Sequence, residues 1–140
     1  MSRLQLAIEQ VVFARNYTIG LLDQTPTAEW FRQPPGGVSH VGWQVGHIAF
    51  SEYRLALWRI RGPQPQDDAL FSPEFERLFG ANSVPEANSA YPLDEIRAVL
   101  NRVHERLLRT NGSSRQQLRD VWPAGERLDG PSVGRPEPGN

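Results

Sequence analysis

Three histidines, His40, His47 and His104, offer the clearest chemistry among the side chains of this sequence. A metal site built from histidine usually takes three protein ligands and leaves one position open for water or substrate. Two histidines on one helix hold an ion most readily when they are four residues apart, but no pair here has that spacing. His40 and His47 are seven residues apart, which is roughly 10 Å along a helix axis and too far to share one ion.

Each histidine also has a purely structural interpretation. His40 is expected on the surface, in the first turn of a helix. His104 borders an apolar stripe and is expected to be partly buried and hydrogen-bonded. His47 lies inside an apolar helix, and its surroundings alone favour a core histidine. A further alternative is an improvised metal site in which His47 and His104 meet across facing helices, with Glu52 or Glu105 nearby.

Two glycines, Gly42 and Gly46, precede His47 in the same predicted helix. Glycine inside a helix destabilises it by about 1 kcal/mol relative to alanine. That loss is offset where the missing side chain lets another element approach closely. The sequence therefore predicts the close approach of another helix beside His47.

The composition excludes several kinds of site. The chain has no cysteine, and all 15 basic residues are arginine, which rules out thiolate ligands, cysteine nucleophiles, Schiff-base lysines and a P-loop lysine. The formal net charge of -1 leaves no surplus for binding nucleic acid or an anionic membrane. No apolar run reaches the ~18–20 residues of a membrane span. We expect a cytoplasmic protein that binds neither nucleic acid nor membranes, with the loop carboxylates Asp67 and Asp68 solvated.

Apolar residues recur at three- and four-residue steps along three long segments, which predicts an all-α fold. The first helix spans about residues 2–24 and is ended by Pro26, because the residue before a proline is disfavoured in helical geometry. The second spans 40–61, begins after Ser39 as its N-cap and stops at Gly62.

The third long helix is expected to begin near Pro92 and to run to about Thr110, where Asn111-Gly112 ends it. A further helical turn or two is expected over 114–121. In the long connection before this helix, a short helix is expected over 73–79.

Residues 1–122 are therefore interpreted as one helical domain. Residues 123–140 contain four prolines and four glycines and show no periodicity, which predicts a disordered tail. The proline- and glycine-rich turn over 34–37 follows Trp30 and Phe31, and these aromatic side chains are expected to pack the loop onto the core.

The segment Ser39–Gly62, SHVGWQVGHIAFSEYRLALWRIRG, resembles the second helix of the DinB-like superfamily, and the preceding EWFRQPPGG resembles that family's approach to this helix. The most specific part is W-x-x-G-H-I-A over Trp43–Ala49. The resemblance covers about Leu4–Trp122 and implies an up-down helical bundle with a three-histidine metal site. It implies that His47 is one ligand of a divalent metal ion, expected to be zinc, nickel or iron.

The resemblance also implies a class of reaction. The relatives include thiol-dependent transferases and isomerases, so a low-molecular-weight thiol or another small molecule is the implied substrate. A bound metal ion would lower the pKa of such a thiol or of water. The family carries its other two ligands as H-x-x-x-H on a fourth long helix, and no residue of this sequence matches them.

We therefore expect three long helices plus short ones, with the fourth bundle helix absent and the chain inactive as it stands. An active form would be a metal-dependent transferase or hydrolase-type enzyme. A truncated product, a frameshifted product and a degenerate relative are equally compatible with the sequence.

A non-catalytic function is the alternative. A four-helix bundle buries an apolar seam of each helix against its neighbours, so a bundle without one helix has an open apolar groove. Such a groove suits a helical interaction module that binds a partner helix, including one from a second copy in a homodimer.

Overall fold

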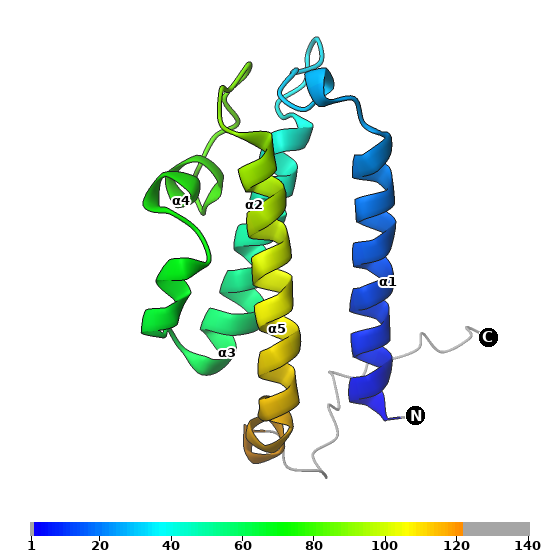
Figure 1. The fold of residues 1–140 in the computed structure, drawn as a ribbon, viewed down its shortest axis with the longest axis vertical. Helices are drawn as coiled ribbons and strands as arrows, with labels where there is room; N and C mark the ends of the chain where they lie inside the picture. The colour runs from blue at the N-terminus through cyan, green and yellow to red at the C-terminus, as the bar shows by residue number, and fades with distance from the viewer. Residues whose placement is uncertain (1, 122–140) are drawn as a thin grey trace, which may run out of the picture.

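A computed structural model describes the backbone of residues 2–121 and the side chains of residues 2–110. Within these residues every regular element is helical, as predicted (Figure 1). The elements are α1 (Arg3–Gln24), the 3-10 helix η1 (Thr27–Glu29), α2 (Val41–Glu52), the π-helix η2 (Tyr53–Trp58), α3 (Arg59–Arg61), the 3-10 helix η3 (Pro65–Ala69), α4 (Pro73–Phe79) and α5 (Leu93–Val121).

The bounds of α1 agree with the prediction. The Ser2 side chain caps the helix by accepting a hydrogen bond from the Gln5 N–H at 3.1 Å. The helix ends before Thr25, whose backbone is extended because Pro26 follows it. None of the described helices has both the length and the apolar character that a bilayer crossing requires.

The predicted second helix over 40–61 corresponds to α2, η2 and α3, which follow one another without a break. We call this continuous segment the α2–α3 rod. It stops at Gly62, as predicted, where φ is +78° and favours glycine. The change to π geometry over Tyr53–Trp58 was not predicted; such single π turns inside α-helices occur frequently at functional sites.

His40 caps the rod, in place of the predicted Ser39. Its Nδ1 accepts a hydrogen bond from the Trp43 N–H at 3.1 Å, and its Nε2 donates to the Glu86 carbonyl at 2.7 Å. The side chain is buried, so the predicted surface position was wrong. The physical reason is that the first N–H groups of a helix need hydrogen-bond acceptors. A neutral imidazole can accept such a bond through one nitrogen and donate a second bond to a neighbouring loop through the other, which draws the ring inside.

The short helix α4 agrees with the prediction for 73–79, and α5 begins next to the predicted start at Pro92. The predicted end of α5 at Asn111-Gly112 was wrong, because the helix continues to Val121. One interior glycine destabilises a helix by only about 1 kcal/mol, and the sequence Arg115-Gln116-Gln117-Leu118 that follows has high helix propensity. The predicted disordered tail over 123–140 lies outside the described residues. The expected absence of a fourth bundle helix stays a prediction.

The core lies between α2, α4 and α5. A side chain at Gly46 would overlap Phe79 of α4, which confirms the predicted close approach of a helix beside His47. A side chain at Gly42 would overlap Phe31, so the close neighbour there comes from the preceding loop. The largest fully buried side chains are those of Trp30, Phe75, Leu57, Leu70, Ile96, Val99 and Val103.

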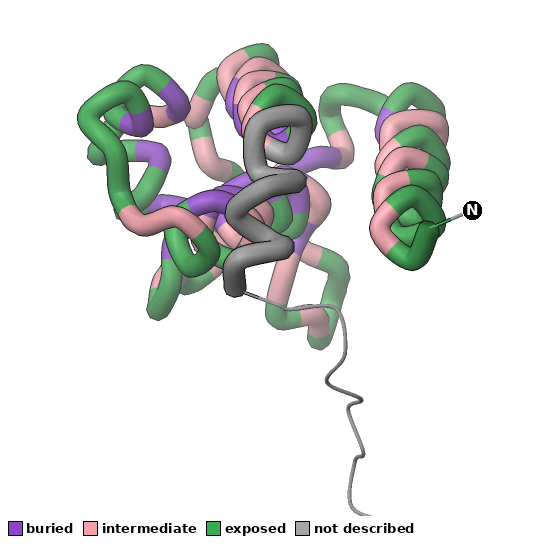
Figure 2. The backbone as a smooth tube through the Cα atoms, turned by 90° about the horizontal axis from the view of Figure 1, so that it is seen from below, coloured by how far each residue is buried: buried purple, intermediate pink, exposed green. Residues whose placement is uncertain are grey.

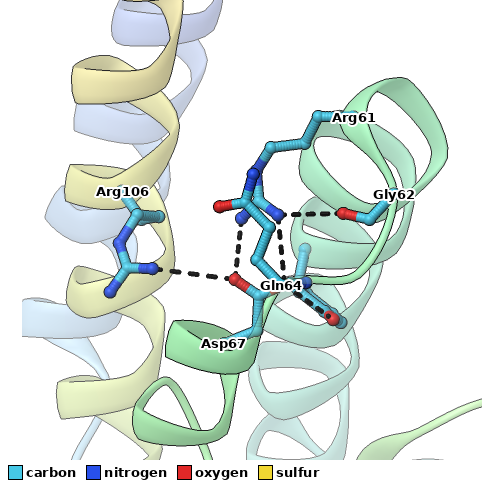
Figure 3. A network of polar contacts seen from close by, with 6 residues as sticks. Arg61, Gly62, Gln64, Asp67 and Arg106 are labelled. Atoms are coloured by element: carbon cyan, nitrogen blue, oxygen red, sulfur yellow. Dashed lines mark hydrogen bonds and ion pairs between the residues drawn. The ribbon is translucent and has the colours of Figure 1, made fainter.

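A buried ion pair fastens the end of the rod to the following loop (Figure 3). Arg61 Nη2 lies 2.7 Å from Asp67 Oδ1, and both side chains are almost fully buried. Asp67 also accepts a hydrogen bond from the Gln64 N–H at 3.0 Å, and Arg106 of α5 lies 3.6 Å away. The predicted solvated position of Asp67 was therefore wrong, because this carboxylate caps η3 and neutralises a buried guanidinium. Asp68 is exposed, as predicted.

The helix α1 stands apart from the other elements (Figures 1 and 2). Leu22 is its one buried residue among those described. Two arginines hold it to α5: Arg15 of α1 donates to Leu100 O at 3.3 Å and to Asn101 Oδ1 at 2.6 Å. From the other side, Arg97 of α5 donates to Asp23 at 2.9 Å. The hydrogen bonds of these two arginines therefore position α1 more than the packing of its apolar side chains does.

Candidate functional site

An open pocket of about 420 Å³ lies between α1, the rod and α5. We call it the central groove. Its lining is mostly apolar and includes Val11 and Ile19 of α1, His47 and Leu55 of the rod, and Leu100 and Leu107 of α5. The sequence-predicted site residue His47 therefore lies in the interior between the long helices and is half-buried there.

The ring of His47 is fixed on two sides. Its Nδ1 lies 2.9 Å from the Phe79 carbonyl oxygen, and a carbonyl can only accept a hydrogen bond. Nδ1 must therefore carry the proton, which leaves the lone pair on Nε2. The ring also stacks on Trp43, with centroids 4.5 Å apart and planes 9° apart, and Trp43 Nε1 donates to Ser83 Oγ at 3.1 Å. This is the tautomer in which a histidine can bind an ion or accept a hydrogen bond through Nε2.

His104 is buried and hydrogen-bonded, as predicted. Its Nδ1 lies 3.0 Å from Glu52 Oε1, which belongs to a side chain that lines the central groove. The pair joins α5 to the rod. The sequence-based interpretation named Glu52 only as a neighbour of His104 in an improvised metal site.

The residues described do not fit a metal ion. Among them, no group of three or more histidine, aspartate or glutamate side chains is placed to hold one. The improvised site of His47, His104 and Glu52 or Glu105 is therefore not formed among these residues. The role of His47 as a metal ligand stays a prediction, and no catalytic step through a metal is derived from this arrangement.

Arg15 is the functional-site residue that the sequence did not reveal, because nothing in the sequence distinguishes it from the other arginines. It lines the central groove, and both hydrogen-bond acceptors of its guanidinium lie on α5. Burial lowers its pKa, and the negative charges of Glu52 and Glu105 act in the opposite direction. The groove thus has a guanidinium and a carboxylate, besides Thr18, His47 and Ser51, among mostly apolar walls.

Three aliphatic side chains of the groove stay partly uncovered. The exposed fractions are 44% for Val11, 46% for Ile48 and 59% for Leu55. Val11 lies on α1, and the other two lie seven residues apart on the rod. The groove therefore presents apolar surface from two facing helices, which suits the binding of another apolar surface more than a polar substrate.

The sequence model of the DinB superfamily matches residues 10–129. The chain belongs to the DinB superfamily. The match includes the segment around His47 and confirms the resemblance on which the fold was expected. No curated protein and no solved structure matched the chain.

Proposed function

We propose that this DinB-superfamily domain is a non-catalytic interaction module whose central groove binds an amphipathic helix. The observation that carries the proposal is the apolar groove with the partly uncovered side chains of Val11, Ile48 and Leu55. Fully burying one such side chain stabilises a protein by about 1.5–3 kcal/mol. Covering three that are about half exposed would contribute roughly 3 kcal/mol on the same scale.

The shape of the groove supports a helix as the occupant. Its walls are long helices that lie alongside one another (Figure 1), and Ile48 and Leu55 follow one wall over about two helical turns. A helix with apolar residues at i, i+3, i+4 and i+7 can set several side chains into such a groove. The carboxylate of Glu52 and the guanidinium of Arg15 already have partners within the domain, so an apolar helix face would leave neither without a partner.

A divalent-metal protein related to thiol-dependent transferases and isomerases is the second candidate. The tautomer of His47 supports it, because the hydrogen bond to the Phe79 carbonyl places the lone pair on Nε2, which can donate it to a metal ion. In the described part of the chain, no group of three ligating side chains gathers around this imidazole. Any small-molecule thiol chemistry would therefore need groups outside that part.

A peptide titration tests the proposed function. A fluorescein-labelled synthetic amphipathic helix with leucines at i, i+4 and i+7 is added to the purified chain, and its fluorescence anisotropy is followed. We expect saturable binding that Leu55→Glu weakens at least about tenfold, which corresponds to about 1.4 kcal/mol. Val84→Glu is the matched control, because Val84 is 76% exposed and does not line the groove. Equal binding by both variants would contradict the proposal.

Isothermal titration separates the second candidate from the first. Zinc and nickel are titrated into the wild-type chain and into His47→Ala. We expect no tight one-to-one binding. Sub-micromolar binding that disappears in His47→Ala would favour the metal-binding function.

A further inference from the structure

A second pocket, of about 410 Å³, is formed by the π-helix η2, the 3-10 helix η3 and the start of α4. We call it the side pocket. It shares no lining residue with the central groove. Its volume lies in the range of pockets that hold small molecules, so it is examined as a separate binding site.

Two aromatic rings, those of Tyr53 and Phe71, form one part of the side pocket. Their centroids lie 5.1 Å apart and their planes meet at 75°, so the two ring faces form a corner. The Tyr53 hydroxyl donates a hydrogen bond to Asp67 Oδ2 at 3.3 Å, which helps to fix its ring. The face of an aromatic ring carries partial negative charge and attracts cations. A cation in this corner can therefore contact two ring faces.

The other part of the side pocket is acidic. Asp67, Asp68 and Glu76 line it, and no basic residue does. Asp67 is neutralised by its ion pair with Arg61. Asp68 and Glu76 are exposed, and neither pairs with a cation among the side chains that the structure describes. These two carboxylates therefore leave the pocket with negative charge.

The hydroxyl of Tyr53 responds to this charge. Burial raises the pKa of Tyr53, and the negative charges of Asp67 and Glu76 raise it further. Glu76 of α4 thus acts on the same space as the aromatic corner, although it comes from a different element. The charge and the ring faces both favour a positively charged ligand.

The arrangement of the carboxylates suits an organic cation better than a metal ion. Within the described residues no three ligating side chains are close enough together to hold a metal. An alkylammonium ion needs no such convergence, because its nitrogen donates hydrogen bonds to carboxylates while its carbon chain contacts apolar surface. We propose that the side pocket binds an alkylammonium ion, with the nitrogen at Asp68 and Glu76 and the carbon chain on the rings of Tyr53 and Phe71.

A matched pair of ligands tests the charge requirement. Hexylamine, which is protonated at neutral pH, and the uncharged 1-hexanol are titrated separately into the chain, and the ring-proton signals of Tyr53 are followed by NMR. The chain has three tyrosines, and Tyr53→Phe identifies the relevant signals. We expect saturable shifts and about tenfold tighter binding of hexylammonium, from ring contacts and exposed ion pairs together. Equal binding of the two ligands would overturn the proposal.

Variants of the exposed carboxylates test which groups hold the nitrogen. We expect Glu76→Gln to weaken hexylammonium binding about threefold and the double variant Asp68→Asn with Glu76→Gln to weaken it about tenfold, with 1-hexanol binding unchanged. Glu9→Gln is the matched control, because it removes the same charge from an exposed residue of α1. A double variant that binds as tightly as this control would overturn the proposal.

The aromatic corner has its own test. We expect Phe71→Leu to lower the preference for hexylammonium over 1-hexanol, because leucine offers apolar surface without a ring face. The ratio of the two affinities is the measurement, so a general loss of binding does not imitate the effect. An unchanged ratio would contradict the role of the ring.

Two further comparisons complete the test. Blocked lysine, Nα-acetyl-lysine amide, carries the same ammonium group: tighter binding of hexylammonium assigns the pocket to a free amine, and tighter binding of blocked lysine assigns it to a lysine side chain of a protein. Either result supports the alkylammonium site. Leu55→Glu should leave hexylammonium binding unchanged, and Glu76→Gln should leave binding of the synthetic helix unchanged, so each proposal can fail while the other stands.

Discussion

Two of the helices that border the central groove, α1 and α5, differ sharply in how they are held. In α5 the residues Ile96, Val99, Leu100, Val103 and Leu107 are all buried. In α1, a helix of 22 residues, Leu22 is the one that is buried. The cause is the distribution of apolar side chains: α5 concentrates them on one face, whereas α1 divides them between the groove and exposed positions such as Phe13 and Tyr17.

This difference indicates which helices contribute most to the stability of the domain. Most of the stability of a protein helix comes from tertiary packing of its apolar face. On that basis the rod, α4 and α5 form the stable part, and α1 is attached to it mainly through arginine bridges. A helix attached in this way retains apolar surface for a second interaction.

Removing one buried ring should show the contrast most strongly. Phe75 is fully buried and packs against the rings of Phe71 and Phe79, whereas Phe13 of α1 is 72% exposed. We expect Phe75→Ala to lower the free energy of unfolding by about 3–5 kcal/mol. Phe13→Ala should change it by less than about 0.5 kcal/mol when the chain is monomeric. Urea denaturation of both variants at low concentration checks this; comparable losses would show that α1 is packed as firmly as the core.

Breaking ion pairs should give the next contrast. Asp67→Ala leaves the guanidinium of Arg61 buried and without its partner, which is expected to destabilise the fold by about 3–5 kcal/mol. Asp23→Ala removes the more exposed pair between α1 and Arg97, and such pairs contribute about 0–1 kcal/mol. Thermal unfolding of the two variants measures the difference, and equal shifts in midpoint would refute it.

The interior glycines should respond with opposite signs. In Gly46→Ala the new methyl group overlaps Phe79, so we expect a loss of about 1–3 kcal/mol. In Gly20→Ala the methyl group meets open space, so the monomer should gain up to about 1 kcal/mol from helix propensity. Chemical denaturation of dilute protein tests both signs. A destabilised Gly20→Ala variant would contradict the open space found at this position.

Acid should lower the free energy of unfolding of the stable part of the domain, and this is the smallest of the four predicted effects. Burial acts to raise the pKa of Asp67, but the hydrogen bonds from Arg61 and from the Gln64 N–H outweigh it and leave the pKa below its ordinary value. The unfolded carboxylate therefore takes up a proton first as pH falls. Its contribution to stability is present above about pH 4 and is lost below that value. Urea midpoints between about pH 6 and pH 3 measure this loss, and Asp67→Asn should lack the Asp67 component of it.

The sequence predicted the helical elements well because their signals are local. Thr25-Pro26 and Gly62 act within one turn of the chain, and each marks a bound found in the structure. The glycines beside His47 also predicted a tertiary contact. An interior glycine indicates that some element packs closely there, even when the sequence does not show which one. Gly46 indeed faces a helix.

Two of the errors concern residues with partners distant in the sequence. His40 bonds to Glu86, and Asp67, besides its nearby partner Arg61, lies 3.6 Å from Arg106 of α5. No local pattern shows that a loop carboxylate will meet two guanidinium groups. The same limit applies to the candidate site, because Arg15 becomes part of the groove only through its bonds to α5.

The two hydrogen bonds of His40 have a consequence for how the domain opens. One imidazole joins the start of the rod to the backbone at Glu86, two segments separated by 46 positions in the chain. Neither segment can detach without leaving a polar group of the other unsatisfied. Fraying of the helix start and release of the loop should thus occur as one cooperative event.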